Sequence, residues 1–251
     1  MELNKRIKDF WEEDAEGYSE GIGRELESSV KDAWVNLILE YAPKKEKLDI
    51  LDVGTGPGFF PIVLTQAGHN VTGTDITENM IACAEDNLKK LGLTAVLLTM
   101  DCQNLTFSDN SFDLIICRNL TWTLDNPEKA YSEWFRVLRP GGRVLIFDAC
   151  WYLHLSGEDA SLEYEQKVQE INDKYGDGGG RRHYNLPELD SISKELFMSD
   201  KIRPQWDMNA LLAAGFSKVF ADVTVGSRYA ETERQKVMQA LHPPFAAGGE
   251  K

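Results

Sequence analysis

A glycine-rich turn that follows a short apolar run constrains this chain more than any other feature. The run spans residues 48–53 and has the length and composition of a buried strand in a parallel sheet. The turn holds three glycines in five residues, Gly54, Gly56 and Gly58, and a stretch typical of a packed helix follows from Phe59. Such a turn points backbone N–H groups at a ligand and favours an anion. A plain strand-to-helix turn would need only one glycine, so we interpret this turn as a ligand site.

The spacing of the glycines narrows the choice of ligand. It is G-x-G-x-G, whereas dinucleotide-binding enzymes use G-x-G-x-x-G. The third glycine of that fingerprint would fall on Phe59, or on Pro61 in the shifted register. The spacing therefore disfavours a nicotinamide dehydrogenase, although it leaves that alternative open.

Charge and composition exclude several classes of partner. The chain has 251 residues and a formal net charge of −14, which argues against nucleic acid or an anionic membrane surface as the main partner. The polar N-terminus is unlike a signal peptide, and no apolar run reaches membrane-spanning length. The four cysteines form no C-x-x-C pair, so a cytoplasmic location is the default expectation. We expect no nucleic-acid and no membrane partner, and the oligomeric state is left open.

Strand and helix patterns alternate from residue 48 to 149, which predicts a doubly wound parallel sheet. Two helices are expected before it, at 2–20 and 25–41. The expected strands are 48–53, 71–76, 95–100, 112–117, 143–149 and 218–225. A last strand at 244–250 is rich in glycine, so we expect it to be short, frayed or missing.

Three segments together resemble a known family. The D-x-G-x-G-x-G pattern from Asp52, FDLIIC at 112–117 and VLRPGGRVLIFD at 137–148 resemble class I S-adenosylmethionine-dependent methyltransferases. They are especially similar to the small-molecule branch with the menaquinone- and ubiquinone-type (UbiE-like, type 11) enzymes. The resemblance covers residues 10–149 well and the remainder weakly.

The resemblance implies a fold and its division. The fold is α/β, Rossmann-like and doubly wound, with a mostly parallel seven-stranded sheet, N-terminal helices and a helical cap insertion. We expect one domain over 1–251. It would comprise N-terminal helices (1–43), a cofactor-binding core (44–150), a cap insertion (151–203) and the C-terminal part of the sheet (204–251).

The resemblance also implies S-adenosyl-L-methionine as cofactor and S-adenosyl-L-homocysteine as product. Asp75, at the end of the second strand, would grip the ribose hydroxyls, as acidic residues there do in nucleotide-binding folds. Asp101 would accept the adenine amino group, and Ile76 would pack on the ring. For Tyr18, contact with the cofactor and anchoring of the helix are both open. The expected cofactor residues are Tyr18, Asp52, Gly54, Thr55, Gly56, Gly58, Asp75, Ile76, Met80, Asp101, Cys102, Gln103, Arg118 and Asn119.

The implied reaction transfers a methyl group to a small-molecule acceptor. Aromatic residues beyond the fourth and fifth strands are the expected acceptor site, because small-molecule sites are walled by such side chains. Residues 118–121 lack the N-P-P-Y/F motif, which speaks against DNA-adenine and glutamine methylation. The expected acceptor residues are Trp122, Trp151, Tyr152, His183 and Tyr184.

His154 is the candidate general base, since a histidine can accept a proton near neutral pH. A histidine packed in the cap is an equally open interpretation. No third ligand accompanies the histidines at a useful spacing, so no metal site is predicted. Two further alternatives stay open: use of S-adenosylmethionine for another chemistry, and a binding or regulatory protein without turnover.

Overall fold

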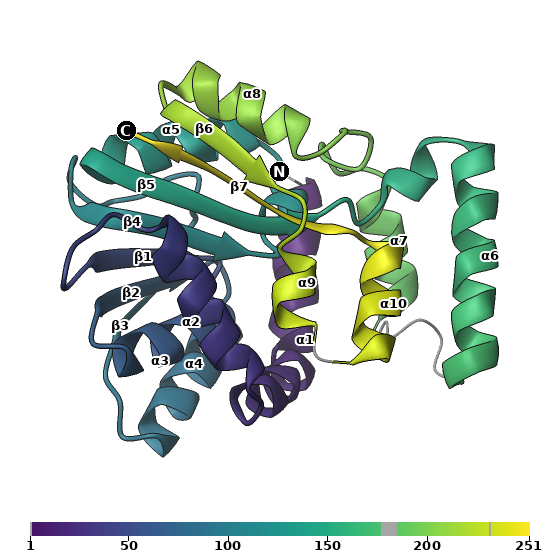
Figure 1. The fold of residues 1–251 in the computed structure, drawn as a ribbon, viewed down its shortest axis with the longest axis horizontal. Coiled ribbons are helices and arrows are strands. Elements are labelled where there is room, and N and C mark those ends of the chain that lie inside the picture. The colour runs from purple at the N-terminus through teal and green to yellow at the C-terminus, as the bar shows by residue number, and fades with distance from the viewer. Residues whose placement is uncertain (1, 177–184, 231) are drawn as a thin grey trace.

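The computed structural model describes residues 2–176, 185–230 and 232–251. Its centre is one seven-stranded sheet with the order β3-β2-β1-β4-β5-β7-β6 (Figure 1). β1 to β5 run parallel, and β7 runs antiparallel to both of its neighbours. The strands are β1 Asp49–Val53, β2 Asn70–Asp75, β3 Val96–Thr99, β4 Phe112–Arg118, β5 Leu138–Ala149, β6 Ser217–Asp222 and β7 Pro244–Glu250. The strand order reverses between β1 and β4, and ligands of open α/β sheets bind beside such a point.

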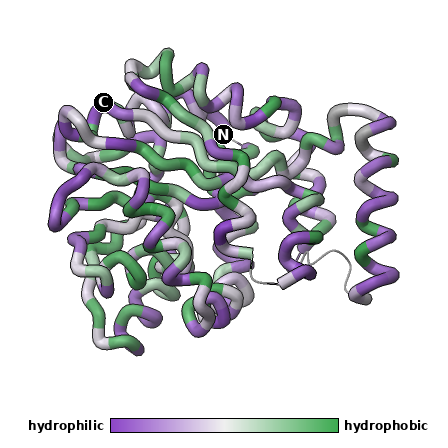
Figure 2. The backbone as a smooth tube through the Cα atoms, in the orientation of Figure 1, coloured by the Kyte–Doolittle hydropathy of each residue, from purple (hydrophilic) through white to green (hydrophobic). Residues whose placement is uncertain are grey.

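Helices cover both faces of the sheet. α2, α3 and α4 lie on one face and α5 and α8 on the other, while α6 stands at one end of the molecule (Figure 1). Hydropathy follows this arrangement, since the central strands are apolar and α6 is mostly hydrophilic (Figure 2). The helices are α1 Glu2–Leu26, α2 Val30–Tyr41, α3 Phe59–Gln66, α4 Glu78–Lys90, α5 Pro127–Val137, α6 Glu158–Tyr175, α7 Leu186–Ser193, α8 Gln205–Ala214, α9 Gly226–Tyr229 and α10 Glu233–Leu241, with short 3-10 helices η1 Thr121–Thr123 and η2 Leu153–Ser156.

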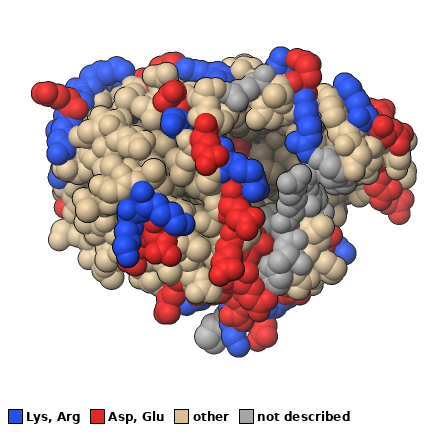
Figure 3. Space-filling view, turned by 90° about the horizontal axis from the view of Figure 1, so that it is seen from below, with Lys and Arg blue, Asp and Glu red and all other residues tan. Residues whose placement is uncertain are grey.

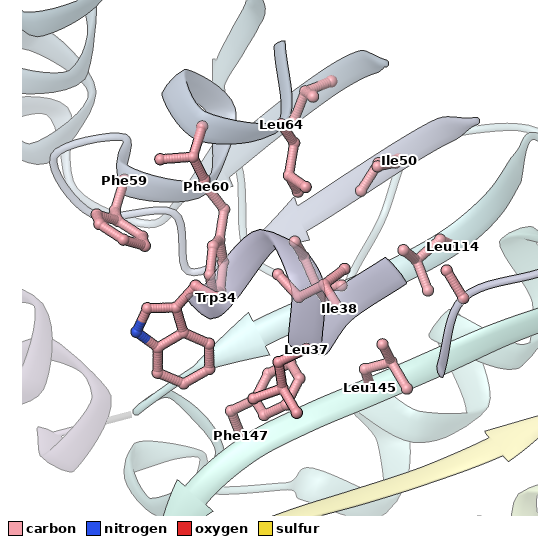
Figure 4. Close-up of a cluster of buried hydrophobic side chains, with 14 of the residues drawn as sticks. Trp34, Leu37, Ile38, Ile50, Phe59, Phe60, Leu64, Leu114, Leu145 and Phe147 are labelled. Carbon is pink, nitrogen blue, oxygen red and sulfur yellow. The ribbon is translucent and has the colours of Figure 1, made fainter. Parts of the chain in front are cut away.

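A large aromatic cluster fixes α2 and α3 on the sheet. The Trp34 ring meets Phe60 edge-on with centroids 5.6 Å apart, and Phe147 of β5 at 5.1 Å (Figure 4). All three side chains are at most 3% exposed. Truncating such a buried aromatic residue typically costs about 3–5 kcal/mol. The cluster therefore holds the elements beside the glycine turn in place.

The last strand is complete, which corrects the expectation that it would be short, frayed or missing. β7 pairs with β5 from Ala149↔Pro244 to Arg143↔Glu250, and with β6 on its other side. Its small residues fit because the neighbours fill the space above them. A Cβ on Gly248 would lie 2.6 Å from the Val144 carbonyl oxygen and 2.7 Å from the Phe220 ring. Backbone ladders on both sides and this packing outweigh the low strand propensity of glycine.

Other boundaries also differ from expectation. α1 runs to Leu26 instead of ending near residue 20, and α2 begins only at Val30 instead of near residue 25. β5 begins at Leu138, five residues before the expected strand 143–149, and residues 139–142 loop out of its pairing with β4. Helices α9 and α10, between β6 and β7, were not expected. In the described ranges no helix is long and apolar enough to cross a membrane.

Candidate cofactor and acceptor site

The glycine turn after β1 is locked to the end of β2. The Thr55 N–H donates to the Thr74 carbonyl oxygen at 2.9 Å, and the Gly56 N–H donates to Asp75 Oδ2 at 2.9 Å. Gly54, Gly56 and Gly58 all have positive φ, a region that side-chain-bearing residues avoid. A Cβ on Gly54 would also lie 2.6 Å from the Leu120 side chain. Three glycines are thus needed for backbone conformation and for close packing.

The Asp75 carboxylate organises this turn. Besides the Gly56 N–H, it accepts the Thr77 N–H at 3.0 Å and the Thr77 hydroxyl at 2.8 Å, both on Oδ1. Burial raises the pKa of Asp75, and these hydrogen bonds oppose that effect. A carboxylate offers about four acceptor positions, and three are filled here. One position is therefore left for a ribose hydroxyl, and a second hydroxyl would compete with donors from the turn of Asp75.

A small cavity of about 110 Å³ lies against this edge of the sheet. Apolar side chains of Met80, Met100 and Leu120 share its wall with the carboxylate of Asp101. The structure brings together in this wall most of the cofactor residues expected from sequence, namely Tyr18, Gly54, Gly56, Asp75, Ile76, Met80, Asp101, Cys102, Gln103, Arg118 and Asn119.

Asp52, Thr55 and Gly58 do not line that cavity. Asp52 is 2% exposed, and its Oδ2 accepts the Thr55 hydroxyl at 2.6 Å behind the turn. Gly58 precedes α3, where a Cβ would lie 3.0 Å from Ala84 of α4. In the structure these three residues hold the turn and its helix in place.

Helix α1 covers the small cavity and is fastened on both sides of it. The Glu12 carboxylate accepts the N–H groups of Glu78 and Asn79 at 2.9 and 2.8 Å, at the start of α4. On the other side, the Asn4 amide donates to Asp125 at 2.6 Å. A carboxylate at a helix N-terminus is stabilising because it meets unpaired N–H groups and the positive end of the helix dipole. α1 is thus held over the cavity by specific contacts.

Arg118 is neutralised by a residue of α1. Its guanidinium donates to both oxygens of Glu25, at 2.6 and 3.0 Å, and lies over the Phe59 ring at 4.4 Å. Asn119 follows with a positive φ of 55°, and its carbonyl oxygen accepts the Trp122 indole N–H. Burial raises the pKa of Tyr18, to which the Asn119 side chain is hydrogen-bonded.

A second cavity of about 580 Å³ adjoins the first, and its wall combines many aromatic side chains with charged ones such as Asp14, Arg24 and Glu25. Four expected residues lie in its wall, Trp122, Trp151, Tyr152 and His154. The molecule is hollowed on the face seen in Figure 3, where acidic side chains gather beside the hollow. Both cavities share the wall residues Trp11, Tyr18, Arg118 and Asn119.

The candidate base His154 belongs to a stacked group in this wall. Its ring lies flat on that of Tyr164, with centroids 3.9 Å apart and planes 8° apart. The Tyr164 hydroxyl is 3.2 Å from Nε2 of His242, which follows α10. His183 and Tyr184 lie outside the described residues. In the parts of the chain that are described, no group of three or more His, Cys, Asp or Glu side chains is placed to hold a metal.

Sequence reasoning missed several residues of the larger cavity. Trp34, Tyr164, Tyr229 and His242 lie in its wall. Their helices, α2, α6, α9 and α10, reach the cavity only through the tertiary arrangement, so sequence spacing carries no signal for them. A partial signal existed for Trp11, a large aromatic residue on the helix that holds Tyr18.

Comparison with known proteins agrees with this architecture. Residues 51–146 match the family model described as "Methyltransferase domain". This segment is a methyltransferase domain. The demethylmenaquinone methyltransferase of Bacteroides fragilis is 27% identical over 149 residues, 58% of this chain and 60% of that protein. The chain thus matches less than two thirds of the length of this relative.

Solved structures share the fold around the methyltransferase domain. A Haloferax volcanii protein in complex with the Trm112 methyltransferase activator superposes with a TM-score of 0.62, at 18% identity and 97% coverage of each chain. A phosphoethanolamine N-methyltransferase of Haemonchus contortus, in complex with phosphomonomethylethanolamine and S-adenosylhomocysteine, has a TM-score of 0.59. Its identity is 18%, over 88% of this chain and 52% of that one. At such identities the likeness shows the fold alone.

Proposed function

We propose that the protein is an S-adenosylmethionine-dependent methyltransferase acting on a small molecule. The observation that carries this is the shared wall of the two cavities. One cavity is built from the strand-end residues of the methyltransferase domain, and the other is an aromatic chamber. Tyr18 and Asn119 line both, so a group held in one cavity meets a molecule held in the other there. The Bacteroides fragilis relative, named for demethylmenaquinone, supports a small-molecule acceptor.

The residues of the small cavity fit the parts of the proposed cofactor. Asp75 and Asp101 supply carboxylates for the ribose hydroxyls and the adenine amino group, and Ile76 and Met80 supply apolar surface for the ring. A Cβ on Gly56 would be in ordinary contact with the side chains of Tyr18 and Met80, at 3.8 and 3.9 Å, so the absence of a side chain at Gly56 leaves room between these two walls. Glu25 already pairs with the Arg118 guanidinium, so a carboxylate of the cofactor would compete with Glu25 there.

S-adenosylmethionine, when bound, supplies a methyl group on a positively charged sulfur atom. The contribution of this chain is positioning, because an in-line displacement needs donor and acceptor held in close alignment. α1 covers the small cavity and is held in place by its contacts at Glu12 and Asn4. An acceptor with an O–H or N–H group must also lose a proton, and His154 in the acceptor wall is the proposed base. The segment 151–203 would act as a cap that supplies this residue.

Calorimetry with S-adenosylhomocysteine and with NAD tests cofactor choice directly. We expect heat of binding for S-adenosylhomocysteine and none for NAD; the reverse result would remove the proposal. Methyl-labelled S-adenosylmethionine is then incubated with a panel of amines, phenols, quinols and thiols. Binding without transfer to any class would favour another use of the cofactor.

His154→Gln separates catalysis from packing once an acceptor is known. If His154 is the base, turnover falls while S-adenosylhomocysteine affinity holds. Wild-type turnover would leave His154 as a packing residue stacked on Tyr164.

A further inference from the structure

A buried carboxylate at the end of β5 holds two of the tryptophans in the acceptor wall, Trp122 and Trp151. Asp148 is 2% exposed. Its Oδ1 accepts the Trp151 indole N–H at 2.8 Å and the Ala149 N–H at 2.8 Å. Its Oδ2 accepts the Trp122 backbone N–H at 3.1 Å and the Thr121 hydroxyl at 2.5 Å. One side chain therefore joins the segment after β4 to the segment after β5.

Arg203 balances the charge of Asp148. Its Nη1 lies 3.2 Å from Asp148 Oδ2, and its Nη2 donates to the Thr121 hydroxyl. Nε and Nη2 also donate to Asp207 at 2.9 and 2.7 Å, and the guanidinium lies over the Phe245 ring of β7. Arg203 is 6% exposed and ends the segment 151–203. This ion cluster thus fastens the far end of the insertion to the sheet beneath the acceptor cavity.

The hydrogen bonds of Asp148 and Arg203 constrain the orientation of the groups they join, whereas apolar packing does not. Buried ion pairs are a poor source of stability, because removing the charges from water costs about as much as their attraction returns. Hydrogen bonds, in contrast, require particular distances and angles, so they fix the orientation of the groups they join. The Trp122 and Trp151 rings lie 6.5 Å apart at 53°, and Trp122 meets Tyr152 at 5.4 Å.

We propose that Asp148 and Arg203 are positioning residues of the acceptor site. They set the separation and tilt of Trp122 and Trp151, and so determine which acceptors fit between these walls. The inference rests on the proposed function only in calling this cavity the acceptor site. Neither residue contributes to the chemistry itself.

Fluorine NMR of protein labelled with 5-fluorotryptophan tests the positioning without any methyl transfer. The six tryptophan signals are assigned with single Trp→Phe variants. In Asp148→Asn the side chain keeps its shape but loses its charge and one acceptor oxygen, while Arg203 keeps its pair with Asp207. We expect the Trp122 and Trp151 signals to shift or split and the Trp34 signal to stay.

Asp207→Asn is the matched control. It removes a carboxylate from the same cluster, and the hydrogen bonds of Asp207 go to Arg203 and Tyr131, not to Trp122 or Trp151. Here the Trp122 and Trp151 signals stay in place. Unchanged signals in Asp148→Asn, or equal changes in both variants, would overturn the proposal. Because the readout needs no acceptor, it stands even if the proposed function fails.

Arg203→Lys provides a second test in case Asp148→Asn folds poorly. Arg203→Lys keeps a cation for Asp207, but a single ammonium cannot span both carboxylates, so the same two signals move. Once an acceptor is known, Asp148→Asn should raise its KM by about tenfold and leave S-adenosylhomocysteine affinity within about twofold. A merely structural role would lower the Tm without this split between acceptor and cofactor, and that result would count against positioning.

Discussion

At the scale of single residues, the polar groups at the strand ends hold the backbone as well as facing the cavities. Asp75 accepts three hydrogen bonds from its own turn and still lines the small cavity. Asp148 accepts hydrogen bonds from Trp122 and Trp151, and so joins the segments that follow β4 and β5. A carboxylate with this double use orders the site in advance, which reduces the cost of ordering it on binding.

Asp75→Ala tests the cofactor side of this double use. The variant loses a charged acceptor for the ribose and the anchor of Gly56, so the Kd for S-adenosylhomocysteine should rise by about tenfold or more in calorimetry. Asp49→Ala is the control, because Asp49 lies at the opposite end of β1. Equal affinity in folded Asp75→Ala and wild type would place the ribose elsewhere.

Asp52 predicts a pH dependence of stability. Burial raises its pKa to about 7, so the folded chain holds this proton more tightly than the unfolded chain. Its contribution therefore falls as pH rises from its ordinary value, near 4, towards 7. The amide of Asp52→Asn does not titrate, so the free energy of unfolding of this variant does not fall for that reason. In urea unfolding, the free energy of unfolding of Asp52→Asn minus that of wild type should increase by on the order of 2 kcal/mol from pH 5 to pH 8.

The control for that measurement is Asp49→Asn. Hydrogen bonds from Asn70 and Arg139 lower the pKa of Asp49, so this residue is ionised in both states across the same pH range. The difference in free energy of unfolding between Asp49→Asn and wild type should therefore stay constant across this pH range. A constant difference for Asp52→Asn as well would show that Asp52 does not titrate in this window.

At the scale of elements, β7 shows that a segment of low strand propensity can form a strand when it pairs with a neighbour on each side. The strand lies between β5 and β6, and Val144 and Phe220 leave no room for a side chain at Gly248. Gly248→Ala should destabilise the fold by about 1–3 kcal/mol through overpacking, as measured by chemical unfolding. Gly23→Ala is the matched control, since nothing lies within 4 Å of its added Cβ. In helix α1 this change should stabilise by roughly 0.5–1 kcal/mol. Equal effects of the two changes would contradict close packing at β7.

At the scale of the whole molecule, α1 connects the sheet domain to the inserted segment. The guanidinium of Arg6 donates to Glu188 at 2.8 Å, to Glu195 at 2.6 Å and to Ser191 at 2.9 Å, in and after α7. Ile7 and Phe10 of the same helix pack with Leu189 against Trp122 and Tyr152. The wall of the larger cavity thus contains residues of both α1 and the inserted segment, among them Trp11 and Leu189.

Arg6→Ala should loosen this connection. We expect faster amide hydrogen exchange over α7 and unchanged exchange in β1 and β4, because the polar contacts of Arg6 reach only the insertion. Wild-type exchange over α7 should rise with salt, since partly exposed ion pairs are screened. Lys5→Ala, a change at an exposed position of the same helix, should leave amide hydrogen exchange over α7 unchanged. Unaltered α7 exchange in Arg6→Ala would mean that apolar packing alone holds it.

What the sequence alone determined is the parallel core and its ligand-binding edge. Apolar runs, glycine spacing and Asp75 are local signals, because a strand-turn-helix unit is encoded within about 30 residues. They predicted the strands from β1 to β5 and part of the lining of the small cavity, but not its residues from the first turns of α1 or from 120–125.

Only the tertiary structure decided the last strand, the length of α1 and the composition of the acceptor cavity. β7 is stabilised by neighbours on both sides, which its own glycines and alanines do not reveal. His242 and Tyr229 reach the cavity wall because α9 and α10 pack there, and Arg203 meets Asp148 across 55 residues of sequence. Contacts between distant segments depend on the packing of the whole chain, so no local pattern records them.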